Sequence, residues 1–262
     1  MSPTAAPLAQ ASVWIIDLDG VMWLAGEPIG DVAGAVAALR AGGARVVYAT
    51  NNSAPSVDEL LARLDRIGID AGPSDLVTSA RVVASLLEPG ERVHVLGEAG
   101  LTEALAARGV LMDGDGPPAA AVVGWSRTFD FAALTAVSSV ARQTGRLVAT
   151  NSDPTHPTPE GLLPGSGALL AAVATASGVA PLVAGKPNPP MVEYIRRHVL
   201  GDGGTAVVVG DQPGTDGVLA DRLGVSFALV DSGVTRPGTP VDACPVAVRA
   251  SDLVSLVATV LG

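Results

Sequence analysis

Two acids separated by one residue are the first side chains along the chain whose types and spacing suit chemistry. Asp17 and Asp19 follow the apolar run Val13–Ile16 and precede a glycine. One carboxylate of such a pair can attack phosphorus, and the other can protonate the leaving oxygen and then activate water. Two carboxylates this close together are costly unless a cation sits between them, which points to Mg²⁺. Taken alone, an Asx turn with a solvated second acid explains the pair equally well.

Further polar residues lie where later apolar runs end or where helices are expected to begin. Thr50, Asn51 and Asn52 follow an apolar run, and a hydroxyl with backbone amides suits a phosphoryl oxygen there. The same residues equally suit a helix N-terminus, because serines follow them and a helix is expected from Val57. Lys186, between glycine and proline at the expected start of a helix, combines an ammonium with a helix N-terminus and so favours an anion.

A second pair of acids completes the set. Asp211 follows the apolar run 207–209 and Gly210, and Asp216 lies five residues later. A carboxylate at the end of a buried strand is a natural ligand for a hard divalent cation. Each signal is weak alone. Their order is stronger, because DxDG, TNN, GKP and GDxxxxD each stand at an apolar strand end or a helix start.

Short apolar runs that alternate with longer Ala/Leu-rich segments supply the elements that position these residues. Most runs are apolar on both faces, as expected for strands of a parallel sheet covered by helices. The expected strands are 13–16, 45–49, 93–96, 120–123, 146–149, 205–209 and 226–230. Three helical faces are formed by Val32, Val36 and Leu39, by Leu60, Leu64 and Ile67, and by Met191, Ile195 and Val199. This alternation predicts an α/β fold, in which ligand sites lie at the carboxyl ends of the strands.

Composition and charge disfavour several classes of partner. The 262 residues are 48% hydrophobic but only 3% aromatic, with a formal net charge of −10 and a pI of about 4.6. An acidic surface repels phosphate backbones and anionic lipids, so neither nucleic acid nor a membrane is expected as a partner. A small phosphorylated substrate stays compatible with this charge, because a bound cation and one lysine reverse the local field.

Three features of the sequence bear on the compartment. Cys244 is the only cysteine, so no intramolecular disulfide forms, which fits the cytoplasm. The first eleven residues lack a basic segment and the apolar run after them stops at Asp17, which is unlike a signal peptide. The stretch 161–185 carries no charge, but its prolines, glycines and hydroxyl residues predict a loop, a small-residue helix and a short strand rather than a membrane span.

In their order and spacing, these motifs resemble those of the haloacid dehalogenase (HAD) superfamily of phosphotransferases. The resemblance is to its type IIA branch, which includes 4-nitrophenylphosphatase-like, phosphoglycolate and pyridoxal phosphatases. It spans nearly the whole chain. The segments that carry it are DLDGVMW at 17–23, PI at 28–29, ATNNS at 49–53, VGW at 123–125, ATNSD at 149–153, HPTPEGLLPGSGAL at 156–169, GKP at 185–187 and GD at 210–211.

The resemblance implies a fold and a division into domains. The fold is a Rossmannoid parallel-sheet core that is interrupted after the TNN motif by an inserted α/β cap domain of the C2 type. The core is expected to comprise 1–82 and 183–262, and the cap 83–182. Because caps of this branch often mediate homodimers, a homodimer through the cap is the expected assembly.

The resemblance also implies a reaction, namely hydrolysis of a small phosphorylated metabolite through a phospho-aspartate with Mg²⁺ as cofactor. Asp17 is the implied nucleophile and a metal ligand. Asp19 is the implied acid/base and offers its backbone carbonyl to the metal. The remaining implied roles are Asp211 as a metal ligand, Asp216 as a residue behind it, Thr50 and Lys186 on the phosphoryl oxygens, and Asn51 and Asn52 beside them.

Other residues near these motifs are open to more than one interpretation. His156 lies in the cap segment that contacts substrate in similar proteins, although a loop histidine bonded to nearby backbone is an equal alternative. Trp23 and Trp125 are expected to be packing residues, although Trp23 follows the catalytic loop closely enough to line the pocket. The positions that depart from the family pattern, and that predict altered loop rigidity beside the metal site, are Gln212, Pro213, Gly214 and Gly217.

Three other functions compete with a phosphatase. A dehalogenase on the same core needs the nucleophile but no leaving-group acid, so Asp19 disfavours it. A phosphomutase has to keep water away from the phospho-enzyme, and the sequence does not show whether the cap does so. A receiver-type signalling domain also forms a phospho-aspartate, but it is less than half this length and carries its acceptor on a middle strand. The physiological substrate depends on the cap loops and is left open.

Overall fold

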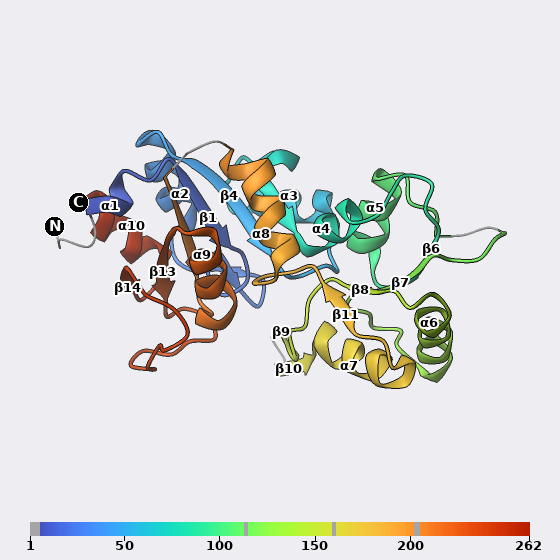
Figure 1. Cartoon of the computed structure of the whole chain (residues 1–262). Coiled ribbons are helices and arrows are strands. Elements are labelled where there is room, and N and C mark those ends of the chain that lie inside the picture. The colour runs from blue at the N-terminus through green and yellow to red at the C-terminus, as the bar shows by residue number, and fades with distance from the viewer. Residues whose placement is uncertain (1–5, 113–114, 159–160, 202–204) are drawn as a thin grey trace. The chain divides into compact units, whose positions relative to one another are not determined.

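The computed structural model describes residues 6–112, 115–158, 161–201 and 205–262 (Figure 1). The chain forms two compact units. Unit 1 contains the described residues up to Thr50, together with Leu61–Val77 and Val192–Gly262. Unit 2 contains Asn51–Leu60 and Thr78–Met191. Each unit has a parallel sheet and helices packed on it, so the predicted α/β class is confirmed.

Unit 1 is built on a six-stranded sheet in the order β14-β13-β12-β1-β4-β5 (Figure 1). Every adjacent pair from β14 to β4 is parallel. Its strands are β1 (Val13–Asp17), β4 (Arg45–Thr50), β5 (Leu76–Thr78), β12 (Ala206–Gly210), β13 (Ser226–Val230) and β14 (Val248–Ala250). A short hairpin follows β1 and pairs β2 (Trp23–Leu24) with β3 (Glu27–Pro28).

The strand order of unit 1 has a switch point between β1 and β12. The chain continues from β1 to β4 on one side and from β12 to β13 on the other, so the connections that follow these two neighbouring strands diverge. In open parallel sheets, ligands bind at the carboxyl ends of the strands beside such a point. The register pairs Ile16 with Val209 and Asp17 with Ala49, so the acids that end β1 and follow β12 lie at one sheet edge.

Helices of unit 1 begin at capping residues and bury one apolar face. Asp31 caps α2 (Val32–Ala41) by accepting from the Gly34 N–H at 2.9 Å, and Asp252 caps α10 (Leu253–Leu261) in the same way. The two helices pack against each other. Other helical segments of this unit are α1 (Ala6–Ala9), α9 (Val218–Leu223), a 3₁₀ turn (Pro73–Asp75) and two π-helical turns (Arg196–Leu200 and Pro213–Gly217). Two helices contribute residues to both units: α3 (Val57–Arg66) and α8 (Pro189–Ile195).

Unit 2 has its own four-stranded sheet, all parallel, in the order β11-β8-β7-β6. Its strands are β6 (Val93–Leu96), β7 (Ala120–Val123), β8 (Leu147–Ala149) and β11 (Pro181–Val183). Its helices are α4 (Ser79–Ser85), α5 (Ala99–Ala107), α6 (Phe131–Thr144) and α7 (Ser166–Ser177). The core between sheet and helices is aliphatic, as the low aromatic content requires, and contains Leu96, Ala121, Val123, Val137, Ala141, Leu147, Ala149, Leu170 and Val173.

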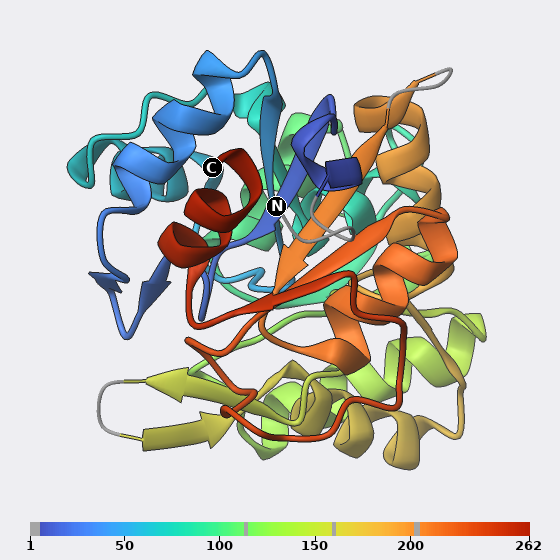
Figure 2. The same ribbon diagram turned by 90° about the vertical axis from the view of Figure 1, so that its left-hand side faces the viewer.

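An antiparallel hairpin follows the sheet strand β8 in unit 2. It consists of β9 (Thr155–Thr158) and β10 (Gly161–Pro164), which Figure 2 shows as two yellow arrows. His156 lies opposite Leu163 in its register. The expected loop around His156 is therefore a strand. Its prolines are compatible with this pairing, because an isolated two-stranded ribbon has edges on which proline is tolerated.

The predicted elements agree closely with the structure. All seven expected strands are present, and their ends differ from the prediction by one residue at most. The expected helical faces are buried, except that Ile67 lies beyond α3, which ends at Arg66. The uncharged stretch 161–185 forms β10, α7 and β11, so its first part is a strand and not the expected loop. Across the part of the chain that the structure describes, none of the helices combines the length and the hydropathy that a membrane crossing requires.

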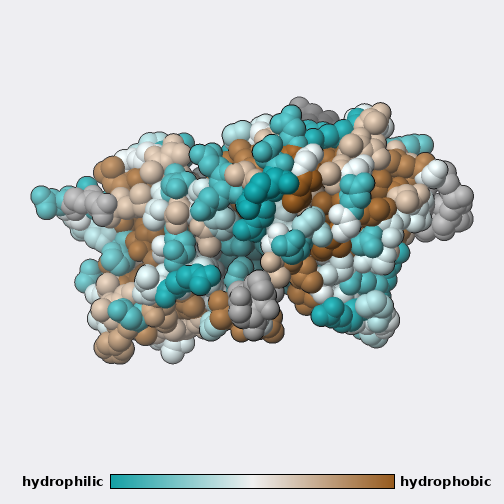
Figure 3. All heavy atoms as spheres, turned by 180° about the vertical axis from the view of Figure 1, so that it is seen from behind, coloured by the Kyte–Doolittle hydropathy of each residue, from teal (hydrophilic) through white to brown (hydrophobic). Residues whose placement is uncertain are grey.

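Some large apolar side chains remain exposed. Phe131 at the start of α6 is 83% exposed, Leu162 in β10 is 70% exposed and Val234 is 61% exposed. On the face seen in Figure 3, hydrophobic residues reach the surface in separate patches among hydrophilic ones. Scattered apolar residues of this kind are normal on protein surfaces and do not by themselves indicate a partner.

Candidate active site

A group of three buried carboxylates lies at the carboxyl edge of the unit 1 sheet. Asp17 ends β1, Asp211 directly follows β12, and Asp216 lies in the π-helical turn after it. Carboxylate oxygens of the three residues lie within 4.8 Å of one another, and the residues are 7%, 1% and 1% exposed. Three like charges gathered away from water are costly unless a cation compensates them. Oxygen is also the donor that Mg²⁺ prefers, so this group fits the predicted ion.

Glycines allow the backbone to enclose Asp211. Gly20, in the loop after β1, has a φ of +88°, and a Cβ added to it would lie 2.6 Å from the Asp211 Oδ2. A Cβ on Gly233, in the loop after β13, would also overlap this carboxylate. The Val234 N–H donates to Oδ2 at 2.5 Å, and the Ser232 hydroxyl donates to the Gly20 carbonyl at 2.7 Å. Two loops thus hold Asp211 in place, and neither glycine can be replaced by a larger residue without moving it.

Asp19 is not one of these three carboxylates and makes a side-chain contact of its own. It is half-buried, and its Oδ1 accepts a hydrogen bond from the indole Nε1 of Trp23 at 2.9 Å. The Asp17 Oδ1 accepts from the Leu18 N–H at 2.8 Å. Thr50 ends β4, the other neighbour of β1, and is 1% exposed. Unit 1 therefore brings Asp17, Asp211 and Asp216 together, with Asp19 in the loop after β1 and Thr50 at the end of β4.

The remaining predicted polar residues lie in unit 2, where Asn51 is central. Its Oδ1 accepts from the Lys186 N–H at 2.7 Å, and its Nδ2 donates to the Lys186 carbonyl at 3.1 Å. Nδ2 also donates to the Asp153 carboxylate at 3.0 and 3.3 Å. The Asn51 carbonyl accepts from the Ser79 hydroxyl and from the Asn151 Nδ2, both at 2.7 Å. Asn51 thus pairs with the main chain of Lys186 as a neighbouring strand would.

Lys186, Asn52 and His156 occupy different environments in unit 2. Lys186 is 3% exposed and lies three residues before α8, which begins at Pro189. The half-buried Asn52 accepts from the Ala54 N–H at 3.1 Å, which is an Asx-type turn. His156 packs against Trp125 with ring centroids 5.2 Å apart and the ring planes tilted by 45°. Trp125 in turn donates its indole N–H to the Pro164 carbonyl at 2.9 Å and carries the Arg127 guanidinium over its ring.

Two models of known protein families match the chain. A haloacid dehalogenase-like hydrolase model matches residues 14–111, and an HAD-hydrolase-like model matches residues 183–255. A dihydroxyacetone phosphatase of Corynebacterium glutamicum is 33% identical over 85% of this chain and 82% of its own length. The chain belongs to the haloacid dehalogenase-like hydrolase family. This confirms the family predicted from the motifs and makes the chain an enzyme of the hydrolase class.

Other members of the family are similar over most of the chain. The D-glycerol 3-phosphate phosphatase of Mycobacterium tuberculosis is 39% identical over 88% of this chain, which spans 66% of that protein's length. A glycerol phosphate phosphatase structure from the same organism, solved with magnesium, superimposes with a TM-score of 0.84 at 35% identity, covering 98% of this chain and 78% of that one. The p-nitrophenyl phosphatase of Archaeoglobus fulgidus gives 0.86 at 27% identity, covering 95% and 99%.

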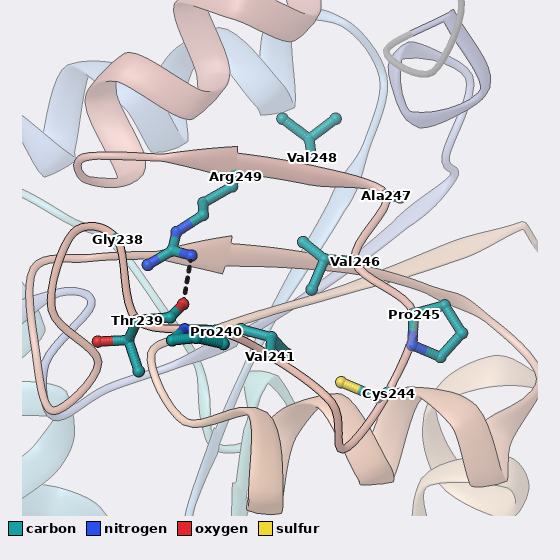
Figure 4. Close-up of a pocket in the computed structure, with 10 residues that line it drawn as sticks. All are labelled: Gly238, Thr239, Pro240, Val241, Cys244, Pro245, Val246, Ala247, Val248 and Arg249. Atoms are coloured by element: carbon teal, nitrogen blue, oxygen red, sulfur yellow. Dashed lines mark hydrogen bonds between the residues drawn. The ribbon is translucent and has the colours of Figure 1, made fainter.

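A pocket elsewhere in unit 1 does not contain any of the predicted HAD site residues. Its volume is about 560 Å³, and it is lined by residues 238–241 and 244–249 (Figure 4). Arg249 closes one side, because it pairs with Asp231 and donates to the Thr239 and Arg236 carbonyls. Burial raises the pKa of the Cys244 thiol, and the Asp221 and Asp216 carboxylates raise it further. The thiol is therefore protonated at neutral pH, which makes it a poor nucleophile.

The structure adds contacts around the HAD motifs that sequence reasoning did not identify. The clearest are the Trp23 indole on Asp19, the 232–234 segment around Asp211, and Asp153 on Asn51. Asp216, expected behind the metal ligands, has a carboxylate oxygen within the same group as Asp17 and Asp211. A Cβ on Gly210 would overlap the Asp216 side chain, so the glycine allows this close approach. The sequence alone does not reveal an approach of this kind. Gly217, a departure from the family pattern, lets Cys244 and Phe227 pack against that turn.

Proposed function

We propose that this HAD-family enzyme is a Mg²⁺-dependent phosphate monoester hydrolase that acts on a small phosphorylated metabolite through a phospho-aspartate on Asp17. The observation that carries the proposal is the group of three buried carboxylates beside the switch point of the sheet. Three buried carboxylates this close together suit a binding site for a divalent ion better than a role in packing. The relatives that align over most of the chain are named as phosphatases of small phosphate esters.

The proposed reaction has two steps that use two acids. In the first, a carboxylate oxygen of Asp17 attacks phosphorus, the bond from phosphorus to the leaving oxygen breaks, and Asp19 gives its proton to that oxygen. In the second, Asp19 takes a proton from water, the water oxygen attacks phosphorus, and the bond to Asp17 breaks to release phosphate. Splitting the displacement in this way requires a nucleophile and a separate acid/base, which two carboxylates in one loop provide.

Asp17 and Asp211 are the proposed side-chain ligands of Mg²⁺, with the Asp19 backbone carbonyl as a third protein ligand. Asp216 is buried in the same carboxylate group, which supports a place beside or behind these ligands. A bound Mg²⁺ supplies positive charge that offsets both the phosphoryl oxygens and the gathered carboxylates. The two loops that contain Gly20 and Gly233 fix the position of the Asp211 carboxylate, so the protein itself sets where this ligand would hold the ion.

Thr50 and Lys186 are the proposed partners of the phosphoryl oxygens, with Asn52 beside them. A hydroxyl and an ammonium are both donors, as such oxygens require. For Asn51 we favour a positioning role over direct contact, since its carboxamide is engaged with the Lys186 main chain and with Asp153. Asn51 would then act by fixing the backbone from which Lys186 extends.

The inserted segment 83–182 is the proposed cap, and His156 its proposed contact with the part of the substrate beyond the phosphate. The tilted packing of His156 against Trp125 supports a fixed ring orientation. A homodimer through the cap and a cytoplasmic location are part of the proposal, the latter supported by the single cysteine. The net charge of −10 disfavours nucleic acid and anionic membranes as partners.

The test is release of inorganic phosphate from p-nitrophenyl phosphate and from a panel of monoesters that includes D-glycerol 3-phosphate and dihydroxyacetone phosphate. Release should depend on Mg²⁺ and should disappear in Asp17→Asn. The exposed helix residue Asp58 offers a matched control, and Asp58→Asn should keep full activity. Interconversion of phosphate esters without release of phosphate would instead identify a phosphomutase. No turnover of any monoester with Mg²⁺ present would refute the proposal.

A further inference from the structure

The loop that carries Asp19 is tied to Trp23 by both main chain and side chain. The Trp23 N–H donates to the Leu18 carbonyl at 3.3 Å, and the Trp23 carbonyl accepts from the Gly20 N–H at 2.8 Å. These bonds place Trp23 beside Asp19 in a single bridge of parallel type. The hairpin that begins at Trp23 turns at Ala25 and Gly26, which both have positive φ, so the turn has the form expected for a two-residue hairpin.

The indole ring of Trp23 is fixed before it makes its contact with Asp19. Trp23 is 1% exposed, and the guanidinium of Arg63 lies over its ring, 5.1 Å from the centroid. From this position the Nε1–H donates to the Asp19 Oδ1 at 2.9 Å. An indole that is 1% exposed and has a cation over its face has little freedom to turn. The bond therefore constrains the Asp19 side chain, and not the reverse.

The chemistry of the two groups decides which carboxyl oxygen can carry a proton. An indole N–H is a donor only, so the oxygen that faces it cannot at the same time direct an O–H towards it. The indole bond therefore occupies Oδ1, and Oδ2 is the carboxyl oxygen outside that bond. Resting on the function proposed above, we propose that Trp23 is a positioning residue, which holds Oδ1 so that Oδ2 delivers the proton to the leaving oxygen and takes it back from water.

The proposal predicts a signature in the leaving group. A poor leaving group, such as the alkoxide of glycerol, needs its oxygen protonated in the transition state, whereas p-nitrophenolate departs with little help. Trp23→Phe keeps an aromatic ring under Arg63 but removes the N–H. It should lower kcat for glycerol phosphate about 10-fold more than kcat for p-nitrophenyl phosphate. Because both substrates are measured on the same preparation, any loss of folded protein cancels in this ratio.

Two further variants separate positioning from packing. Arg63→Met removes the cation above the ring but leaves the indole–carboxylate bond, and should change the ratio of the two kcat values less than about twofold. In an Asp19→Ala background, Trp23→Phe should have no further effect on the ratio, because the group that it positions is gone. An unchanged ratio in Trp23→Phe, or an equal change with and without Asp19, would show that Trp23 only packs. Absence of Mg²⁺-dependent turnover in the wild type would instead refute the proposed function, so the two failures are distinguishable.

Discussion

Two largely buried polar clusters in this chain are built from different chemistry. In unit 1, Asp17, Asp211 and Asp216 gather three carboxylates within 4.8 Å. In unit 2, Asn51 joins the main chain of Lys186 to Asp153 through neutral amide groups. The first cluster concentrates charge of one sign, and the second matches donors to acceptors. Clusters of the first kind lower stability unless a cation compensates them, whereas clusters of the second kind hold the fold together.

This difference predicts opposite consequences for substitutions in the two clusters. Replacing a carboxylate in unit 1 removes chemistry but relieves repulsion, so activity falls while the metal-free protein stays as stable or gains stability. Replacing the amide in unit 2 leaves donors and acceptors unmatched, so stability falls first. The proposed function depends on this division, and each prediction below tests one side of it.

The largest effect is expected for Asp17→Asn. An amide has no anionic oxygen to attack phosphorus, so kcat should fall by at least about 10⁴-fold, as for other single losses of a nucleophile. The midpoint of thermal unfolding without metal should stay level or rise, because one of three gathered charges is gone. Phosphate release and a thermal scan on the same sample check both halves. Substantial activity, beyond what deamidation of the amide restores, would exclude the covalent mechanism.

Removal of the metal should have the next largest effect. Chelation with EDTA should abolish turnover and Mg²⁺ should restore it, while Ca²⁺ should inhibit, because it takes more ligands at longer distances and so misplaces the attacking carboxylate. A second readout does not depend on activity. Mg²⁺ at 100 times its dissociation constant should stabilise the fold by about 2.7 kcal/mol.

A matched pair of variants tests the ligand assignment. Asp211→Asn should lose the stabilisation by Mg²⁺, whereas Asp58→Asn, an exposed acid in α3, should keep it. An equal gain of stability in both variants would place the ion elsewhere.

Sequence patterns predicted the sheet and the acids but not the contacts that position them. Both-face apolar runs are a strong signal for parallel strands, so all seven predicted strands were found. The same pattern predicts where β1 and β12 end, and Asp17 and Asp211 stand at those ends. The short strands β5 and β14 were not predicted, since three residues give no period to detect, whereas β11 is the short strand expected within 161–185.

The partners of individual side chains could not be predicted at all. Trp23 was expected to pack or to line the pocket, and nothing in its spacing shows that its N–H reaches Asp19. Asn51 was expected beside the phosphate, and nothing in its motif shows that its carboxamide also meets Lys186, 135 residues later in the chain. A residue type in a motif limits the bonds that a side chain can make. Its partner depends on which segments the fold brings together.

Among the variants of unit 2, Asn51→Ala should affect stability most. It leaves the N–H of Lys186 without its acceptor at a buried position, so we expect the free energy of unfolding to fall by about 2–4 kcal/mol. Asn52→Ala is the matched control. Asn52 is half-buried and accepts from Ala54 within its own turn, so its loss should cost at most about 1 kcal/mol. Urea unfolding of the two variants compares them directly. Equal losses of unfolding free energy would contradict a role of Asn51 in holding the Lys186 main chain.

His156→Ala tests whether the hairpin of unit 2 contributes to selectivity. A contact that is made equally in the ground state and the transition state changes KM and leaves kcat nearly untouched. We expect KM for the best natural substrate to rise several-fold, with little change for p-nitrophenyl phosphate. The control is His198→Ala, because His198 is exposed and its ring packs at a tilt against Tyr194. An unchanged KM across the panel of monoesters would make His156 a structural residue.

The smallest effect is expected for Asp153, and it tests whether the amide cluster needs charge or only an acceptor. Asp153 accepts from the Asn51 Nδ2 through both oxygens and is half-buried. Asp153→Asn keeps one carbonyl oxygen for that bond, whereas Asp153→Ala removes the acceptor. A hydrogen bond to a charged group is worth roughly 1 kcal/mol more than one to a neutral group, and partial exposure reduces the difference. The Asn variant should therefore lose at most about 1 kcal/mol, and the Ala variant clearly more. If both lose the same amount, the carboxylate charge itself is required, and the amide cluster is closer in kind to the acid cluster than its hydrogen bonds suggest.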